Sequence, residues 1–131
     1  MQVMKQLSIF LENKPGTLAE VCDALSQRGI NLLALTCVDA VDHAVVRLVP
    51  DMPDAAAHVL GNAGMLVVEN DVLMLEVPNE PGSLGEVAAQ LAQHELNIEY
   101  AYCTVSADQP TGALVLRTRD GERAMEVLSS D

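Results

Sequence analysis

The sequence predicts a protein of the α+β class that contains two copies of one small module in tandem. At 131 residues the chain can form one ordinary domain or two very small ones. Half of the residues are apolar and only 2% are aromatic, so leucine, valine, alanine and isoleucine must fill the core of a globular protein. Strand-like and helix-like patterns alternate along the chain, and they do so twice in the same order.

An internal repeat organises the whole chain. Residues 7–37 realign on residues 73–103 without a gap, at a constant offset of 66. A gapless match of this length indicates duplication. The identical pairs include Asn13/Asn79, Pro15/Pro81, Gly16/Gly82, Leu18/Leu84, Glu20/Glu86, Val21/Val87, Leu25/Leu91, Asn31/Asn97 and Cys37/Cys103.

Each copy begins with a strand that has one apolar face. Every second residue is apolar over residues 7–11 and again over 73–77, which places these apolar side chains on one face, as in a strand with one buried side. Residues 13–16 then read Asn-Lys-Pro-Gly in the first copy, and residues 79–82 read Asn-Glu-Pro-Gly in the second. Proline and glycine in this order predict a turn.

A helix follows the turn in each copy. Thr17 with Glu20, and Ser83 with Glu86, match the capping box that satisfies free amides at a helix start. The apolar residues then recur with helical spacing, and Gly29 is placed to end the first helix as a left-handed cap. The two apolar stripes are Leu18, Val21, Cys22 and Leu25, and Leu84, Val87, Ala88 and Leu91.

The second half of each copy adds two strands and another helix. In the first copy a second strand from Asn31 leads through a short turn at 39–43 into a third strand, a helix and a fourth strand that runs almost directly into Val72. The second copy has a longer loop near residues 107–112. The predicted third strands are 44–49 and 113–118, the second helices 53–62 and 121–129, and the fourth strand 65–69.

These elements give a ferredoxin-like βαββαβ module with an antiparallel sheet and both helices on one face. We place the first module at residues 1–70 and the second at residues 71–131. The second module lacks its last strand, because the sequence stops at Asp131 where that strand should begin. Its exposed edge should then be covered by the other copy, by a second chain, or by residues 64–72.

The charge of the chain restricts its partners. The formal net charge is −12 and only seven residues are lysine or arginine, which disfavours both nucleic acid and an anionic membrane surface. No apolar run reaches the roughly 18–20 residues of a membrane span. The first six residues do not resemble a secretion signal, so we expect a cytoplasmic protein.

Catalytic, cofactor and metal sites find no support in the sequence. Cys22, Cys37 and Cys103 are odd in number and have no Cys-x-x-Cys spacing, so free thiols are expected rather than disulfides or zinc ligands. The acidic segment from Asp39 to His43 fits either a metal site or a solvated turn, and general turn chemistry favours the latter. We therefore expect no enzyme, no cofactor and no metal.

The turn before the first helix carries the chemistry that suggests a ligand. Gly16 and Gly82 permit close approach to the backbone, and a helix start offers free amides to a carboxylate. Asn13 and Asn79 each add one acceptor and two donors, which suits the two charged ends of a free amino acid. Asn31 and Asn97, each 18 positions further on, are expected at the same end of the sheet. The alternative is that Asn-x-Pro-Gly serves only as a tight turn.

The segment LENKPGTLAEVCDALSQRGINL resembles the start of an ACT domain. It is similar to the effector-binding domains of bacterial phosphoglycerate dehydrogenase and of the acetolactate synthase small subunit, which hold an amino acid at a domain–domain interface. The resemblance implies two half-sites and a backbone contribution from the helix starts. The half-sites are Asn13, Gly16 and Asn31, and Asn79, Gly82 and Asn97; the backbone positions are Thr17, Leu18, Ser83 and Leu84.

The resemblance also implies a function and a partner. We expect a small regulatory protein, paired as a homodimer, that binds a free amino acid at a module or subunit interface and modulates amino-acid metabolism. The alternative is a subunit that controls a separate metabolic enzyme by protein contact, without a ligand.

The two copies differ near the expected sites. Glu95 stands where the first copy has Gly29, so the second helix is not expected to end in the same left-handed turn. Tyr100 replaces Ala34, which changes the bulk beside the site. The two sites therefore need not bind the same ligand.

Overall fold

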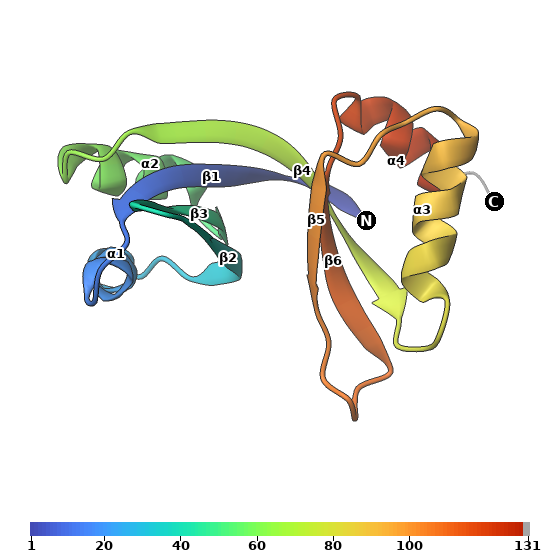
Figure 1. Cartoon of the computed structure of the whole chain (residues 1–131), viewed down its shortest axis with the longest axis horizontal. Helices are drawn as coiled ribbons and strands as arrows, with labels where there is room; N and C mark the ends of the chain where they lie inside the picture. Colours follow the sequence, from blue (N-terminus) through green and yellow to red (C-terminus); the bar gives the residue numbers. More distant parts are fainter. Residues whose placement is uncertain (130–131) are drawn as a thin grey trace. The chain divides into compact units, whose positions relative to one another are not determined.

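The computed structural model describes residues 1–129 and divides the chain into two compact units. Residues 5–70 form what we call the first unit. Residues 1–4 join the chain from Asp71 onward in the second unit. Each unit combines strands with two helices, as the sequence predicts (Figure 1).

The first unit has the predicted βαββαβ order, and its strands lie in the order β2-β3-β1-β4. The β1–β3 and β2–β3 pairs are antiparallel. Apolar residues on one face of the sheet pack against both helices, and this face forms the core; its fully buried members include Leu7, Ile9, Val21, Val46, Leu48, Ala56 and Leu60. The elements are β1 (Gln2–Glu12), α1 (Thr17–Ser26), β2 (Leu32–Ala40), β3 (His43–Pro50), α2 (Pro53–Asn62) and β4 (Val67–Pro78).

The second unit repeats this arrangement, with the strand order β1-β4-β6-β5. β6 pairs antiparallel with both β4 and β5, and α3 and α4 lie on the same side of this sheet (Figure 1). Its core contains Leu73, Leu75, Val77, Val87, Leu91, Leu114, Leu116, Ala124 and Val127. The additional elements are α3 (Ser83–Gln93), β5 (Tyr100–Thr104), β6 (Thr111–Arg117) and α4 (Gly121–Ser129).

Strand β4 corrects the prediction of two separate strands around residue 70. The fourth strand of the first module and the first strand of the second module form one continuous strand, Val67–Pro78. No glycine or proline interrupts residues 67–77, so the residues that most strongly break a strand are missing there. β4 therefore contributes its first residues to the first unit and the remainder to the second.

The N-terminal residues cover the edge that the sequence left open in the second module. β1 is the neighbour of β4, and Met1–Met4 belong to the second unit. Val3 lines a cavity together with residues 71–73, while Met1 and Gln2 line another with residues 74–76. Gln2–Met4 thus occupy the place of the missing fourth strand. No strand follows α4 within the described residues, which end at Ser129, and Asp131 lies outside them.

The predicted capping boxes are wrong. Gly16 and Gly82 occupy the N-cap positions of α1 and α3, with φ angles of 95° and 91°, and no side chain caps either helix. Thr17 and Ser83 are already the first helical residues. Because a capping box needs a hydroxyl side chain at the N-cap itself, glycine at that position excludes it.

The expectation that Glu95 would change the helix ending is also wrong. Glu95 adopts a φ of 57°, close to the 70° of Gly29. Equivalent backbone hydrogen bonds end both helices. Ile30 N–H donates to the Leu25 carbonyl at 3.1 Å, and Leu96 N–H donates to the Leu91 carbonyl at 2.9 Å. The chain must turn at this point to start the next strand, so the fold imposes the left-handed conformation on a residue that disfavours it.

Candidate functional site

In the first unit, Asn13 ties the end of β1 to the β2–β3 hairpin. Its backbone N–H donates to the Asp42 carbonyl at 3.3 Å, and its side-chain Nδ2 donates to Asp39 Oδ1 at 2.6 Å. Since a carboxylate can only accept here, the amide nitrogen must face Asp39. Asn13 therefore helps to hold the turn, and its side chain uses one of its two amide hydrogens to do so.

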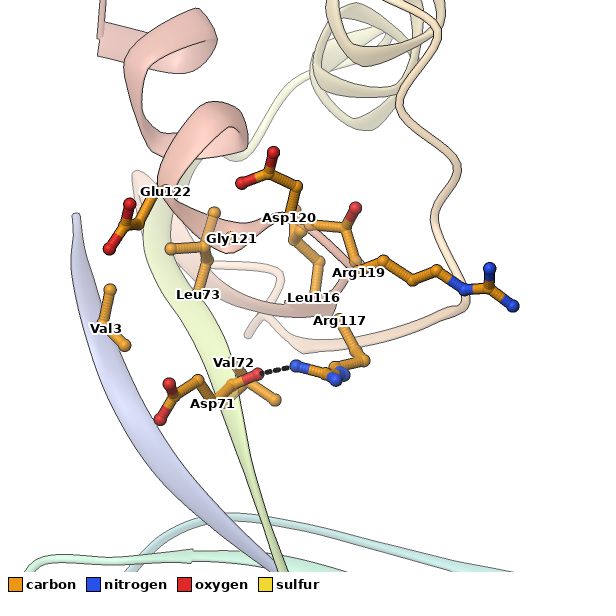
Figure 2. A pocket seen from close by; sticks show the side chains of 11 residues that line it. Val3, Asp71, Val72, Leu73, Leu116, Arg117, Arg119, Asp120, Gly121 and Glu122 are labelled. Atoms are coloured by element: carbon orange, nitrogen blue, oxygen red, sulfur yellow. Dashed lines mark hydrogen bonds between the residues drawn. The ribbon is translucent and has the colours of Figure 1, made fainter.

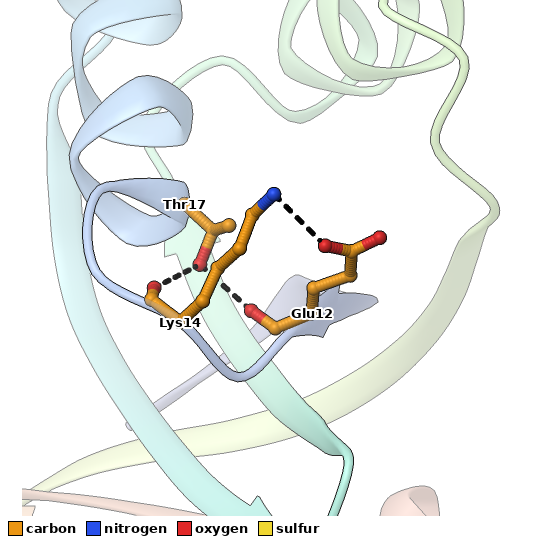
Figure 3. A network of polar contacts seen from close by, with 3 residues as sticks. All are labelled: Glu12, Lys14 and Thr17. Carbon is orange, nitrogen blue, oxygen red and sulfur yellow. Dashed lines mark hydrogen bonds and ion pairs between the residues drawn. The ribbon is translucent and has the colours of Figure 1, made fainter.

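The rest of this loop is held by its own side chains (Figure 3). Thr17 Oγ1 lies 2.9 Å from the Glu12 carbonyl and 3.1 Å from the Lys14 carbonyl, and its single hydrogen is shared between them. Lys14 Nζ lies 3.0 Å from Glu12 Oε2. The hydrogen bond and the charge of Glu12 raise the pKa of Lys14 above its usual 10.5. The first loop therefore presents a cation that is already paired.

In the second unit, Asn79 is equivalent to Asn13 but forms more hydrogen bonds. Its backbone N–H donates to the Pro110 carbonyl at 2.9 Å. Its Nδ2 donates to the carbonyls of Ser106 at 3.2 Å and Gln109 at 2.8 Å. Both amide hydrogens thus hold the long β5–β6 loop, and only Oδ1 of this side chain can serve a ligand.

A small cavity lies beside the second loop. Its volume is about 120 Å³, and it is formed by the end of β4, the start of α3 and parts of β5 and β6. Ser83 lines it, is only 8% exposed, and its Oγ has no hydrogen-bond partner among the described residues. The other residues that line it include Asn79, Glu80, Leu84, Cys103 and Val105.

The structure does not bring Asn31 together with Asn13. Glu12 is opposite His43 in the sheet, whereas Leu32 is opposite Pro50, so the two asparagines flank opposite ends of β3. A strand of eight residues is about 26 Å long. Asn31 instead forms two hydrogen bonds with Asp51. The Asn31 N–H donates to Asp51 Oδ1 at 3.0 Å, and the Asp51 N–H donates to the Asn31 carbonyl at 2.9 Å.

Asn97 and Asn79 are separated in the same way. Glu99 N–H donates to the Arg117 carbonyl at 2.8 Å, whereas Pro78 is opposite Thr111 at the other end of β6. The expectation of a common end was wrong because α1 and α3 each return the chain to the opposite end of the sheet before the second strand begins. Asn97 instead lines a separate cavity of about 300 Å³ with Arg119.

The largest cavity near that far end does not include any predicted site residue. It has a volume of about 350 Å³ and is lined by Val3, residues 71–73 and the start of α4. Figure 2 shows Arg117 Nη1 donating across it to the Asp71 carbonyl at 2.8 Å. Arg117 also lies 3.6 Å from Glu99. The arginine is therefore engaged in holding the ends of the strands.

Sequence reasoning did not select Glu80, Cys103 or Val105 as site residues, although all three line the small cavity. The exchange of Lys14 for Glu80 in otherwise matching loops is a signal that could have identified the first of them. The contribution of Val105 depends on the β5–β6 loop, which has no counterpart of equal length in the first module.

Metal ligands, cysteines and long apolar helices can be compared with the sequence predictions over the residues that the structure describes. Within residues 1–129, no group of three or more His, Cys, Asp or Glu side chains is arranged to hold a metal ion. Cys22, Cys37 and Cys103 are free thiols. Over the same residues, no helix has both the length and the apolar character needed to cross a bilayer.

Comparison with known proteins identifies the family. The model of the ACT domain pair matches residues 1–131. The chain belongs to this ACT domain pair family. A structure of protein BT0572 from Bacteroides thetaiotaomicron is 36% identical, with a TM-score of 0.90 over 97% of this chain and 87% of that one. A comparison with curated protein sequences found no match.

More distant structures share the fold. The regulatory subunit of aspartate kinase from Thermus thermophilus has a TM-score of 0.73 at 16% identity, over 98% of this chain and 93% of that one. The corresponding subunit from Thermus flavus has a TM-score of 0.64 at 17% identity, over 98% and 94%. These structures share only the fold with this chain, and the predicted α+β fold with two tandem ACT-type modules is confirmed.

Proposed function

We propose that this protein is a cytoplasmic regulatory protein that binds a free amino acid at the loops before α1 and α3 and thereby modulates amino-acid metabolism. The observation that carries the proposal is the shared geometry of the two loops. Each has an asparagine, a left-handed glycine and a helix start in sequence. Membership of the ACT domain pair family supports it.

The chemistry of such a loop matches the two ends of an amino acid. The first helical bond of α1 runs from Glu20 N–H to Gly16 O at 3.0 Å, so the N–H groups of residues 17–19 have no acceptor within the helix. They are therefore suited to a carboxylate, which the positive end of the helix dipole also favours. The Oδ1 atom of Asn13 or Asn79 is an acceptor suited to the ammonium group.

The asparagines at the start of the second strands need a different role from the one the sequence suggested. Asn31 and Asn97 are at the far end of their own modules, so neither can share a ligand with the loop asparagine of the same module. We propose that they contribute to the site from another module, across a homodimer. This arrangement would make the ligand a regulator of subunit pairing.

A thermal-shift screen against the twenty amino acids tests the proposal. A ligand present at 100 times its dissociation constant should raise the free energy of unfolding by roughly 2.7 kcal/mol. Light scattering with and without the best ligand should then show a change in the fraction of dimer. The absence of a shift with every amino acid at 10 mM would overturn the proposal.

The alternative function is a ligand-independent subunit that controls a separate metabolic enzyme. Exposed apolar side chains in the first unit favour it. Val45 is opposite both Phe10 and Val38, which are 49% and 46% exposed, and Val41 at the hairpin tip is 86% exposed. A stoichiometric complex with an enzyme, formed equally well with and without amino acids, would support this alternative over the first proposal.

A further inference from the structure

The loops before α1 and α3 have the same backbone but opposite charges at one position. Lys14 and Glu80 are equivalent residues of the two copies. Lys14 is a cation already paired with Glu12, at 3.0 Å. Pro78 stands at the position of Glu12 in the second copy, so Glu80 has no equivalent pair. An ammonium group is attracted to Glu80 and repelled by Lys14.

The hydroxyl groups at the helix starts also differ. Thr17 Oγ1 is satisfied by two carbonyls of its own loop, at 2.9 and 3.1 Å. Ser83 Oγ is buried beside the 120 Å³ cavity and has no partner among the described residues. A buried hydroxyl without a partner is unfavourable, so a ligand that formed a hydrogen bond with it would remove that cost.

The cavity limits the size of such a ligand. Apolar groups of Leu84 and Val105 and the Cys103 thiol line it together with Ser83 and Glu80. Ser83 N–H already donates to the Glu80 carbonyl at 3.3 Å. A carboxylate beside Ser83 would therefore receive the hydroxyl hydrogen and the N–H groups of Leu84 and Gly85. An ammonium group would then face Glu80, and little space would remain for a side chain.

We infer that the working site of this chain is the loop before α3, and that its ligand is a small α-amino acid with a short side chain. The carboxylate binds at Ser83 and the α3 start, and the ammonium group binds at Glu80 and Asn79 Oδ1. The loop before α1 has the same backbone conformation but does not bind the amino acid. This inference rests on the proposed function and adds which loop works and which class of amino acid it takes.

The two equivalent cysteines provide a direct test of which loop binds. Cys37 and Cys103 are both exposed and occupy the same position in the two copies, and only Cys103 is identified as a lining residue of the cavity. The full chain is alkylated with iodoacetamide in the presence of each amino acid other than cysteine, whose own thiol would consume the reagent, and the rate at each cysteine of the chain is read by mass spectrometry. At ten times the dissociation constant, the rate at Cys103 should fall about tenfold while Cys37 is unaffected.

The outcomes separate this inference from the proposed function. A thermal shift with protection of Cys37, of both cysteines or of neither overturns the inference and leaves the proposed function standing. A thermal shift with phenylalanine or lysine but not with glycine, alanine or serine overturns the size class. The absence of any shift overturns both.

A matched pair of variants tests the charge at the loop. Glu80→Lys should weaken binding of the best amino acid by at least about tenfold, because it replaces attraction of the ammonium group with repulsion. Lys14→Ala, at the equivalent position, should leave the affinity within about twofold. Ser83→Ala should fold normally and weaken binding, and unchanged affinity in both Glu80→Lys and Ser83→Ala would place the ligand elsewhere.

Discussion

The loop at Asn13 and the loop at Asn79 have nearly the same backbone and different networks of side-chain bonds. The φ angles of Gly16 and Gly82 differ by only a few degrees, at 95° and 91°. In the first loop the Thr17 hydroxyl and the Lys14 ammonium bond to their own loop. In the second loop the asparagine is the main tie, and the Ser83 hydroxyl has no partner among the described residues.

The comparison shows that a duplicated turn can be retained for its shape while its surface chemistry changes. Both copies form the same turn because the proline, the glycine and the hydrogen bonds of the asparagine, which the two copies share, set the backbone. The side chain between asparagine and proline does not affect that shape, so lysine and glutamate are both compatible with it. Structure and binding can therefore diverge at different positions of one motif.

The largest expected effect comes from removing the asparagine ties. Asn79→Ala loses two hydrogen bonds and should lower the free energy of unfolding by about 2 kcal/mol, whereas Asn13→Ala loses one side-chain bond to an exposed carboxylate and should lower it by about 1 kcal/mol. Urea unfolding of both variants measures the difference. Equal losses would show that the second asparagine is not the stronger tie.

The hydroxyl groups should have smaller and unequal effects. Thr17→Ala removes the bonds to the Glu12 and Lys14 carbonyls and should cost about 1 kcal/mol. Ser83→Ala removes a buried hydroxyl without a partner and should raise the free energy of unfolding by up to about 1 kcal/mol. A loss of about 1 kcal/mol from Ser83→Ala, measured by the same unfolding experiment, would mean that its hydroxyl is satisfied in solution.

The helix endings give a further contrast. Glu95→Gly should stabilise the protein by about 0.5 kcal/mol, since glycine removes left-handed strain but gains entropy in the unfolded chain. Gly29→Ala should destabilise it by about 1 kcal/mol for the converse reason. The two melting temperatures should therefore move in opposite directions, and a lower value for Glu95→Gly would show that the glutamate conformation is not strained.

The smallest effect concerns pH. Glu12 raises the pKa of Lys14 above 10.5, so this pair contributes stability below the unfolded-state pKa and loses it as pH rises through the raised value. Both side chains are exposed, at 71% for Glu12 and 63% for Lys14, so the contribution is small. Melting curves of Lys14→Met should differ from the parent by a constant amount between pH 6 and 9. A difference that changes with pH in that window would require another titrating partner.

Much of the fold could be predicted because local patterns were strong. The helices Pro53–Asn62 and Gly121–Ser129 begin and end where the sequence placed them. Their first residues follow clear breaks in the pattern, and their apolar residues have helical spacing. The duplication supported the first three strands and both helices of the module twice, since a pattern that was weak in one copy could be checked in the other.

The errors arose where several segments meet. The capping boxes had the right residue types, but the glycine before each hydroxyl residue became the N-cap. The second asparagines were placed at the wrong end because sequence spacing does not show which end of a sheet a strand starts from. The candidate cavity could not be predicted in full, since Cys103 and Val105 reach it only because β5 pairs with β6, which in turn pairs with β4.

By itself, the sequence determined the repeat, the order of elements and the two loops proposed as the site, because these depend on local periodicity and on turn residues. Only the tertiary structure decided that Gln2–Met4 cover the edge of the second unit and that Ser83 has no partner in its buried position. Both facts depend on contacts between residues far apart in the chain. No local pattern specifies such contacts, because they follow from how the strands are ordered in the sheet.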